Sequence, residues 1–221
     1  MSLSRRFIVT LFRILTSCVF RIHDEALFSV PQYGPLIIVT NHINILEIPV
    51  IYAHLQPRQV HGLVLADRWK NPVIAWGLNA SGAIPLERGS GNLESIHRSL
   101  EVLNAGEILL IMPEGTRSGD GRLQDAQPGV ALLALKSKAP LFPIVFHGGE
   151  NYQQNLKKFQ RTDFFITVGK PFCLDAHGEV VNGAVRKQMA DEIMYQLAAI
   201  LPAAYRGCYA DLSQATAKYL I

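Results

Sequence analysis

The sequence predicts a single α/β domain with a mixed, largely parallel central sheet flanked by helices, and an N-terminal helix at a membrane surface. The chain has 221 residues, 49% of them hydrophobic and 18% charged, which suits one domain with a full core. Short apolar runs alternate with longer stretches of helical periodicity, and no linker or repeat divides them. Strand–helix alternation of this kind is typical of a parallel sheet covered on both faces.

The apolar run Phe7–Phe20 has two arginines before it and Arg13 near its middle. Its fourteen residues are too few to cross a bilayer, and a central arginine opposes insertion. We therefore expect residues 1–23 to form an amphipathic helix at a membrane surface, with its arginines facing phosphate headgroups. A helix that merely covers the sheet is the alternative, because it has the same amphipathic pattern. Residues 24–221 then form the folded domain.

Seven later runs have the length and the β-branched, apolar composition of strands. They are Ala26–Val30, Leu36–Thr40, Val60–Ala66, Ala83–Leu86, Ile108–Met112, Leu141–His147 and Phe164–Val168. Helical spacing predicts helices between and after them. These are Ile45–Leu55, Pro72–Asn79, Asn92–Asn104, Val130–Lys138 and a last one over about Gly183–Ile200. In Asn92–Asn104 four apolar residues recur at helical spacing, and Gly106 ends the helix.

Charge and cysteine content exclude several functions. The formal net charge is +3, which suits an anionic surface or substrate, but no basic run with interleaved aromatic residues indicates a nucleic-acid groove. Cys18, Cys173 and Cys208 lie far apart without CxxC spacing, so we expect neither a disulfide framework nor a metal site. His147, at the end of an apolar run, is expected to be a satisfied core or rim histidine without a direct catalytic role.

His42 and Glu47 lie where the expected strand Leu36–Thr40 gives way to a helix. A neutral imidazole can take a proton from an alcohol, and a carboxylate can hold the ring in the required tautomer. Residues five apart do not share a helix face, so the two can meet only if His42 precedes the helix. With Asn44 as N-cap, however, Glu47 would occupy the third position of a capping box and bond the Asn44 amide. Both roles of Glu47 remain open on spacing alone.

A second polar segment, Glu114–Ser118, follows the expected strand Ile108–Met112. Its glycine allows the backbone to approach a ligand closely, and Arg117 can grip a phosphate with two hydrogen bonds. A polar turn with a surface arginine is the alternative. The short run Ala83–Leu86 leads to Arg88 in a similar way, which alone is a weak signal.

Four blocks of the chain occur in an order that carries a resemblance. They are Asn41-His42-x4-Glu47, Gly82–Arg88, Pro113–Ser118 and Ala139–Ile144. Together they resemble the four blocks of the glycerolipid acyltransferase family, which includes bacterial 1-acylglycerol-3-phosphate acyltransferases. The third block behind the first is the most specific part of the resemblance. The tail Leu201–Gly207 also resembles bacterial members.

The resemblance implies that a fatty acyl group moves from an acyl thioester to the free hydroxyl of a lysophospholipid, above all 1-acylglycerol 3-phosphate, giving phosphatidate. His42 would be the general base and Glu47 its partner, without an acyl-enzyme. The residues implied for the acceptor phosphate site are Arg88, Glu114, Gly115, Thr116 and Arg117. Those implied for the acyl or donor pocket are Pro140 and Pro143. The family has Asp where this chain has Glu47, which adds one methylene, about 1.5 Å of reach.

The implied partners are a lysophospholipid, an acyl thioester and a membrane surface, with peripheral attachment at the cytoplasmic face of the cell membrane. The acyl donor would be acyl-CoA or acyl carrier protein, and no cofactor is expected. Two alternatives remain. The acceptor could be glycerol 3-phosphate or another lysolipid, or the protein could be a catalytically weak lipid-binding, membrane-docking protein in which Glu47 only caps a helix.

Overall fold

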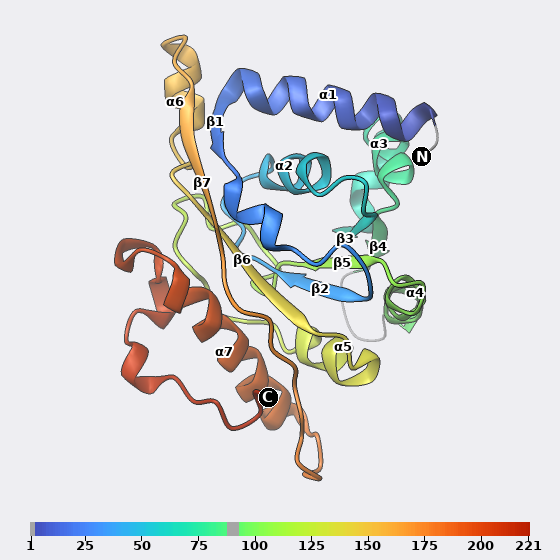
Figure 1. Cartoon of the computed structure of the whole chain (residues 1–221), viewed down its shortest axis with the longest axis vertical. Coiled ribbons are helices and arrows are strands. Elements are labelled where there is room, and N and C mark those ends of the chain that lie inside the picture. Colours follow the sequence, from blue (N-terminus) through green and yellow to red (C-terminus); the bar gives the residue numbers. More distant parts are fainter. Residues whose placement is uncertain (1–2, 88–92) are drawn as a thin grey trace.

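The computed structural model describes residues 3–87 and 93–221, and it contains a seven-stranded sheet in the order β1-β7-β6-β2-β5-β3-β4 (Figure 1). The strands are β1 (Phe20–His23), β2 (Leu36–Val39), β3 (Val60–Leu65), β4 (Ile84–Leu86), β5 (Ile108–Ile111), β6 (Leu141–His147) and β7 (Thr162–Val168). Neighbouring strands are parallel except for β6 and β7, which are antiparallel. The expected mixed, largely parallel sheet is confirmed.

Helices cover both faces of this sheet, with α1 and α2 on one side and α4, α5 and α7 on the other (Figure 1). The helices are α1 (Leu3–Val19), α2 (Glu47–His54), α3 (Pro72–Ser81), α4 (Leu93–Asn104), α5 (Gly129–Ser137), α6 (Tyr152–Lys157) and α7 (Gly183–Ile200). Short 3₁₀ turns complete the chain: η1 (Glu25–Ser29), η2 (Ala66–Lys70), η3 (Ala203–Tyr205), η4 (Gly207–Tyr209) and η5 (Leu212–Gln214).

The central strand β2 shows why its sequence is apolar throughout. Leu36 and Ile38 belong to the core under α1 and α2, whereas Ile37 and Val39 belong to the core under α5 and α7. All four side chains are buried. Successive side chains of a strand point to opposite faces, so a strand with helices on both sides must be apolar at every position.

Helix α1 packs on α2 through its buried residues Ile8 and Val9. Arg13 donates to the carbonyl of Ala53, and Arg5 donates to the carbonyl of Arg58, both near the carboxyl end of α2. The position of Arg13 is favourable because the last carbonyls of a helix carry partial negative charge. The expectation that the arginines of this helix face phosphate headgroups is therefore wrong for these two. Among the described residues, no helix combines the length and the hydropathy that crossing a bilayer requires.

The expected strand over Ala26–Val30 is wrong, because this segment contains the 3₁₀ turn η1. The Leu27 amide donates to the Asp24 carbonyl, and the Val30 amide donates to the Leu27 carbonyl. The first strand is instead Phe20–His23, which pairs with β7 far along the chain. A run of apolar residues does not reveal whether such a distant strand partner exists, so tertiary pairing decided which segment became the strand.

The five strands from β6 to β4 run in the same direction, so their carboxyl ends meet at one edge of the sheet. Helix α2, which follows β2, packs on one face of the sheet, whereas α5, which follows the neighbouring β5, packs on the other. The connections after β2 and β5 therefore lead to opposite faces of the sheet. In α/β sheets, ligands bind in the crevice outside the carboxyl ends of the strands at such a switch point. Both polar segments identified in the sequence follow these two strands.

Beyond Val39 a side chain continues the pairing between β2 and β6. Asn41 donates through Nδ2 to the Phe146 carbonyl at 2.9 Å and accepts through Oδ1 from the Phe146 amide at 2.8 Å. Asn41 is buried, and Phe146 is buried with it. The Asn41 side chain thus takes the place of the backbone hydrogen bonds between β2 and β6, at the point where the loop carrying His42 leaves the sheet.

We predict that Asn41→Ala lowers the free energy of unfolding by about 3 kcal/mol, because it leaves a buried backbone N–H and C=O unpaired. Urea unfolding followed by circular dichroism measures this. Gln153→Ala is the control, since Gln153 makes an exposed hydrogen bond to Tyr152 and should change stability by less than about 0.5 kcal/mol. Equal effects of the two substitutions would contradict the bracing role of Asn41.

Candidate active site

The two polar segments meet through hydrogen bonds between their backbones. The His42 carbonyl accepts from the Ser118 amide at 2.8 Å, and the Ile43 carbonyl accepts from the Gly119 amide at 3.1 Å. In the other direction, the His42 amide donates to Glu114 Oε1 at 2.8 Å. The loop after β2 is therefore held directly against the loop after β5 at the crevice.

Glu47 both caps the loop and faces the histidine ring. Its side chain is 0% exposed, and its Oε1 accepts from the amides of Ile43 and Asn44, the latter at 2.8 Å. The same oxygen lies 3.4 Å from His42 Nδ1. The predicted bond to the Asn44 amide is confirmed, and the contact with the ring exists beside it.

The expected N-cap at Asn44 is wrong. Helix α2 begins at Glu47 with Leu46 in the N-cap position, two residues later than expected. Asn44 Oδ1 instead accepts from the Leu46 amide at 2.8 Å, which forms an asparagine turn ahead of the helix. This extra turn lets the His42 ring fold back toward Glu47, which spacing within one helix forbids.

The geometry favours one tautomer of His42. Nδ1 faces a carboxylate oxygen, so it carries the proton, and the lone pair then resides on Nε2. The side chain is 16% exposed, enough for contact with a small reacting group at the crevice. A separation of 3.4 Å is long for a hydrogen bond, and such contacts shorten when the ring becomes charged during a reaction.

Glu114 is a second buried carboxylate that joins the two loops. It is 3% exposed, and its Oε2 accepts from the Gln124 amide at 3.0 Å while Oε1 holds the His42 amide. Burial raises the pKa of this carboxyl to about 7 despite the opposing effect of the two amide donors, and the negative charges of Glu47 and Asp120 add to the rise. The structure thus gives Glu114 a bracing contact, and its implied contact with an acceptor phosphate stays a prediction.

Gly115, Thr116 and Arg117 form the exposed turn that follows Glu114. Gly115 has φ of +68°, in the left-handed region that favours glycine. The turn lies next to the loop carrying His42, because Ser118 bonds that loop directly. Sequence and structure agree in bringing this segment to His42.

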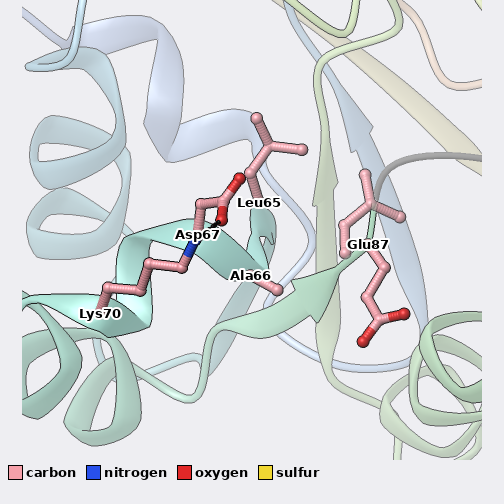
Figure 2. A pocket seen from close by; sticks show the side chains of 6 residues that line it. Leu65, Ala66, Asp67, Lys70 and Glu87 are labelled. Carbon is pink, nitrogen blue, oxygen red and sulfur yellow. Dashed lines mark ion pairs between the residues drawn. The ribbon is translucent and has the colours of Figure 1, made fainter.

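A cavity of about 300 Å³ opens at the carboxyl ends of β3 and β4, at the same sheet edge as His42. Figure 2 shows its lining, with the ion pair Asp67–Lys70, 2.5 Å between Oδ1 and Nζ, beside Ala66, and Glu87 across the cavity. Arg88 is the next residue of the chain and lies outside the described residues.

The two predicted pocket prolines occupy different levels of β6. Pro143 pairs with Val39 and is buried close to where the His42 loop begins. Pro140 precedes β6, and its carbonyl accepts from the Ile37 amide at the amino edge of the sheet. The structure therefore places Pro143 near the crevice and Pro140 at the opposite edge from His42.

Tyr205 supports the site in a way that sequence reasoning missed. Its carbonyl accepts from the Leu123 amide at 2.9 Å, and its hydroxyl donates to Glu150 at 2.6 Å. Burial and the Glu150 carboxylate raise the pKa of Tyr205 to about 12. Its ring lies where a Cβ on Gly121 would come within 2.9 Å. Only the resemblance of the Leu201–Gly207 tail pointed to this segment, because its contacts are made by residues far apart in the chain.

His147 lies beside Tyr205, with ring centroids 5.6 Å apart, and stacks on Phe165 at 5.0 Å. Burial lowers its pKa, although the nearby Glu150 opposes the shift. These contacts are those of a partly buried histidine at the rim of the crevice, as expected.

Comparison with known proteins identifies the family. A family model described as Acyltransferase matches residues 21–147, which is more than half of the chain and includes every residue of the site up to His147. The chain belongs to the acyltransferase family. The expected membership is confirmed, and His42, Glu47 and Glu114–Arg117 all lie within the matched part of this acyltransferase fold.

Several known proteins are similar to the chain. It is 32% identical over 117 residues to a chloroplastic 1-acyl-sn-glycerol-3-phosphate acyltransferase of Brassica napus, and the match covers 52% of this chain and 33% of that protein. It is 25% identical over 143 residues to a 1-acyl-sn-glycerol-3-phosphate acyltransferase of Bacillus subtilis, covering 65% of this chain and 69% of that protein. The chain spans about a third of the length of this Brassica napus protein and of a chloroplastic 1-acyl-sn-glycerol-3-phosphate acyltransferase of Arabidopsis thaliana.

A solved structure shares the fold. The 1-acyl-sn-glycerophosphate acyltransferase PlsC of Thermotoga maritima superposes with a TM-score of 0.63 at 19% identity, covering 86% of this chain and 76% of that one. The α/β architecture is thus one that an acyltransferase structure also has.

We predict that Glu114 makes stability depend on pH. Its pKa is about 7 in the folded state against an ordinary value of 4.5, so its contribution is fully present below pH 4.5 and is lost as the pH rises through 7. The loss amounts to about 3 kcal/mol. Urea unfolding of the wild type at about pH 4.5, 6 and 8 measures it, with Glu114→Gln as the control for other titrating groups. An identical pH dependence in that variant would contradict this assignment.

Proposed function

We propose that the protein transfers a fatty acyl group from a thioester to the free hydroxyl of a lysophospholipid, with 1-acylglycerol 3-phosphate as the acceptor and phosphatidate as the product. One observation carries this proposal. An accessible imidazole faces a fully buried carboxylate at the carboxyl edge of the sheet, next to an arginine-bearing turn. The plant and bacterial relatives named as 1-acyl-sn-glycerol-3-phosphate acyltransferases support the choice of acceptor.

The proposed reaction uses His42 as the general base. Nε2 takes the proton from the acceptor hydroxyl as its oxygen attacks the thioester carbonyl, and Glu47 stabilises the imidazolium that forms. The tetrahedral intermediate then collapses, the carbon–sulfur bond breaks, and the leaving thiolate receives the proton from His42. No acyl-enzyme forms, and the ring returns to its starting tautomer.

Recognition of the acceptor is proposed for the turn Gly115–Arg117 together with Arg88. A phosphate monoester is largely dianionic near neutral pH, and guanidinium groups bind it with two hydrogen bonds. Arg117 is exposed on the turn next to the His42 loop, which is where an acceptor phosphate would have to lie. Acyl-CoA and acyl carrier protein are the two donors to be compared in the assay.

We also propose peripheral attachment through α1, at the cytoplasmic face of the membrane. Five large apolar residues of α1 are exposed: Leu3, Phe7, Leu11, Ile14 and Leu15. They recur at helical spacing, so they form one stripe, and the residues Val9 and Thr16 on the opposite side of the helix are buried. A helix with an exposed apolar stripe, whose Arg13 bonds α2 and whose Arg5 bonds the segment after α2, suits an interface with lipid acyl chains.

The decisive experiment incubates the purified protein with lysophosphatidate and labelled acyl-CoA or acyl carrier protein. We expect His42→Ala to lower kcat by about 10³-fold or more, because no other group takes the hydroxyl proton. The control is His97→Ala, since His97 pairs with Glu101 on the exposed face of α4. Acyl transfer by His42→Ala at the wild-type rate would refute the mechanism.

Glu47 has two roles that its variants separate. In Glu47→Gln the amide oxygen can take the place of Oε1, which accepts from the Ile43 and Asn44 amides and faces Nδ1, but the neutral side chain no longer stabilises the His42 imidazolium. We expect a fall in kcat of about 10³-fold, by comparison with the serine-protease template, together with a normal melting temperature. If Glu47→Gln transfers acyl chains normally, Glu47 is only a cap.

Arg117→Ala should raise the KM for lysophosphatidate about tenfold or more and leave kcat nearly unchanged, because phosphate binding holds the acceptor in both the ground and transition states. Initial rates against acceptor concentration measure this. Arg122→Ala is a matched control on the same loop, since Arg122 is also exposed. An unchanged KM in Arg117→Ala would remove Arg117 from the acceptor site.

A further inference from the structure

We propose that the end of α6 and the turn that follows it, residues Leu156–Arg161, form a second membrane contact that inserts Phe159 among the headgroups of an anionic lipid surface. We refer to these residues as the basic tip. The proposal rests on the peripheral attachment proposed above and adds to it a site that α1 does not contain.

The basic tip combines one projecting aromatic side chain with positive charge. Phe159 is 99% exposed, and Leu156 beside it is exposed as well. Lys157 and Lys158 are also exposed, and the sequence between residues 151 and 162 contains no acidic residue. An exposed aromatic residue flanked by lysines matches an anionic interface, because the ring enters the acyl boundary while the ammonium groups stay among the phosphates.

The backbone places Phe159 at the point where a helix ends. The Gln160 amide donates to the Asn155 carbonyl at 2.9 Å, and the Phe159 amide donates to the Leu156 carbonyl at 3.0 Å. This pattern is that of a Schellman motif, whose left-handed position is usually filled by glycine. Phe159 has φ of +55°, so a bulky residue occupies a conformation that glycine would adopt more easily. Folding alone therefore does not account for a phenylalanine here.

The basic tip lies beside the end of α1. Arg161 Nε donates to the Phe20 carbonyl at 3.1 Å, directly after α1, and Phe20 pairs with Thr162 in the sheet. In Figure 1 the turn at the end of α6 rises past α1 on the same side of the molecule. The apolar stripe of α1 and the basic tip can therefore meet one lipid surface together.

This second contact would orient the active site. A single helix at an interface leaves the protein free to rotate about the helix axis, whereas a second contact away from that axis restricts the rotation. Helix α6 follows directly from the carboxyl edge of β6, and Asn44 Nδ2 donates to the Gly149 carbonyl at 3.3 Å. Because the His42 loop is thus joined to the segment that leads into α6, docking of the tip holds the crevice close to the membrane.

The test measures partition of the full chain onto vesicles of phosphatidylcholine, with and without phosphatidylglycerol. We expect Phe159→Ala and Phe159→Gly each to lower partition onto mixed vesicles about tenfold. Phe159→Gly should also keep or raise the melting temperature, because glycine relieves the left-handed backbone. Lys157→Gln with Lys158→Gln should lower partition about fivefold per lysine, on phosphatidylglycerol vesicles only.

Phe28→Ala is the matched control, because Phe28 is 86% exposed on η1 outside the basic tip, and it should partition like the wild type. Acyl transfer to detergent-dispersed lysophosphatidate should stay unchanged in all these variants. Wild-type partition of both Phe159 variants overturns the proposal whether or not the enzyme is active. If these variants partition like the wild type but lose activity only with acyl carrier protein as the donor, the proposal is also overturned, and the tip is assigned to an acidic protein partner. If the Phe159 variants lose vesicle binding but the wild type shows no acyl transfer, the proposed function is refuted and the membrane contact at the basic tip is supported.

Discussion

The hydrogen bonds from the loop after β2 to two buried carboxylates are the interaction on which the site depends. Glu47 accepts the amides of Ile43 and Asn44, and Glu114 accepts the amide of His42. These amides lie between a strand and a helix and have no partner in either, so without the carboxylates they would remain unpaired in a buried loop. The carboxylates thus set the backbone path that presents the imidazole, and Glu47 faces the ring with the same oxygen.

The position of the site follows from sheet topology. Because α2 and α5 lie on opposite faces, the chain leaves β2 and β5 toward opposite faces at the carboxyl edge, and hydrogen bonds join the two loops there. Asn41 ties the start of the first loop to β6, and Tyr205 holds the second loop from the carboxyl-terminal side. The chemistry is therefore carried by loops, but each loop is hydrogen-bonded to rigid elements around it, which suits a base that must keep one tautomer.

Helix α1 shows how one amphipathic pattern can serve two surfaces. Its buried face packs on α2, and Arg13 and Arg5 bond carbonyls in α2 and in the segment after it, while its outward side carries an exposed apolar stripe. The two readings of the sequence, a covering helix and an interfacial helix, are thus compatible in one structure. The basic tip at the end of α6 lies on the same side of the molecule. It differs from the apolar stripe of α1, because its single aromatic ring is surrounded by positive charge. The tip belongs to the segment that leads away from the active-site edge of the sheet.

Local patterns in the sequence determined most of the elements: helix α7 begins and ends as expected, and the apolar runs β2, β5 and β6 are strands. The same patterns brought His42 and Glu114–Arg117 to one edge, because parallel strands align their carboxyl ends. Tertiary structure alone decided that Phe20–His23 and not Ala26–Val30 joins the sheet, that Asn44 does not cap α2, and that Glu114 braces the His42 loop. Periodicity and capping act within a few residues, whereas these outcomes depend on hydrogen-bond partners that only the folded chain brings within reach.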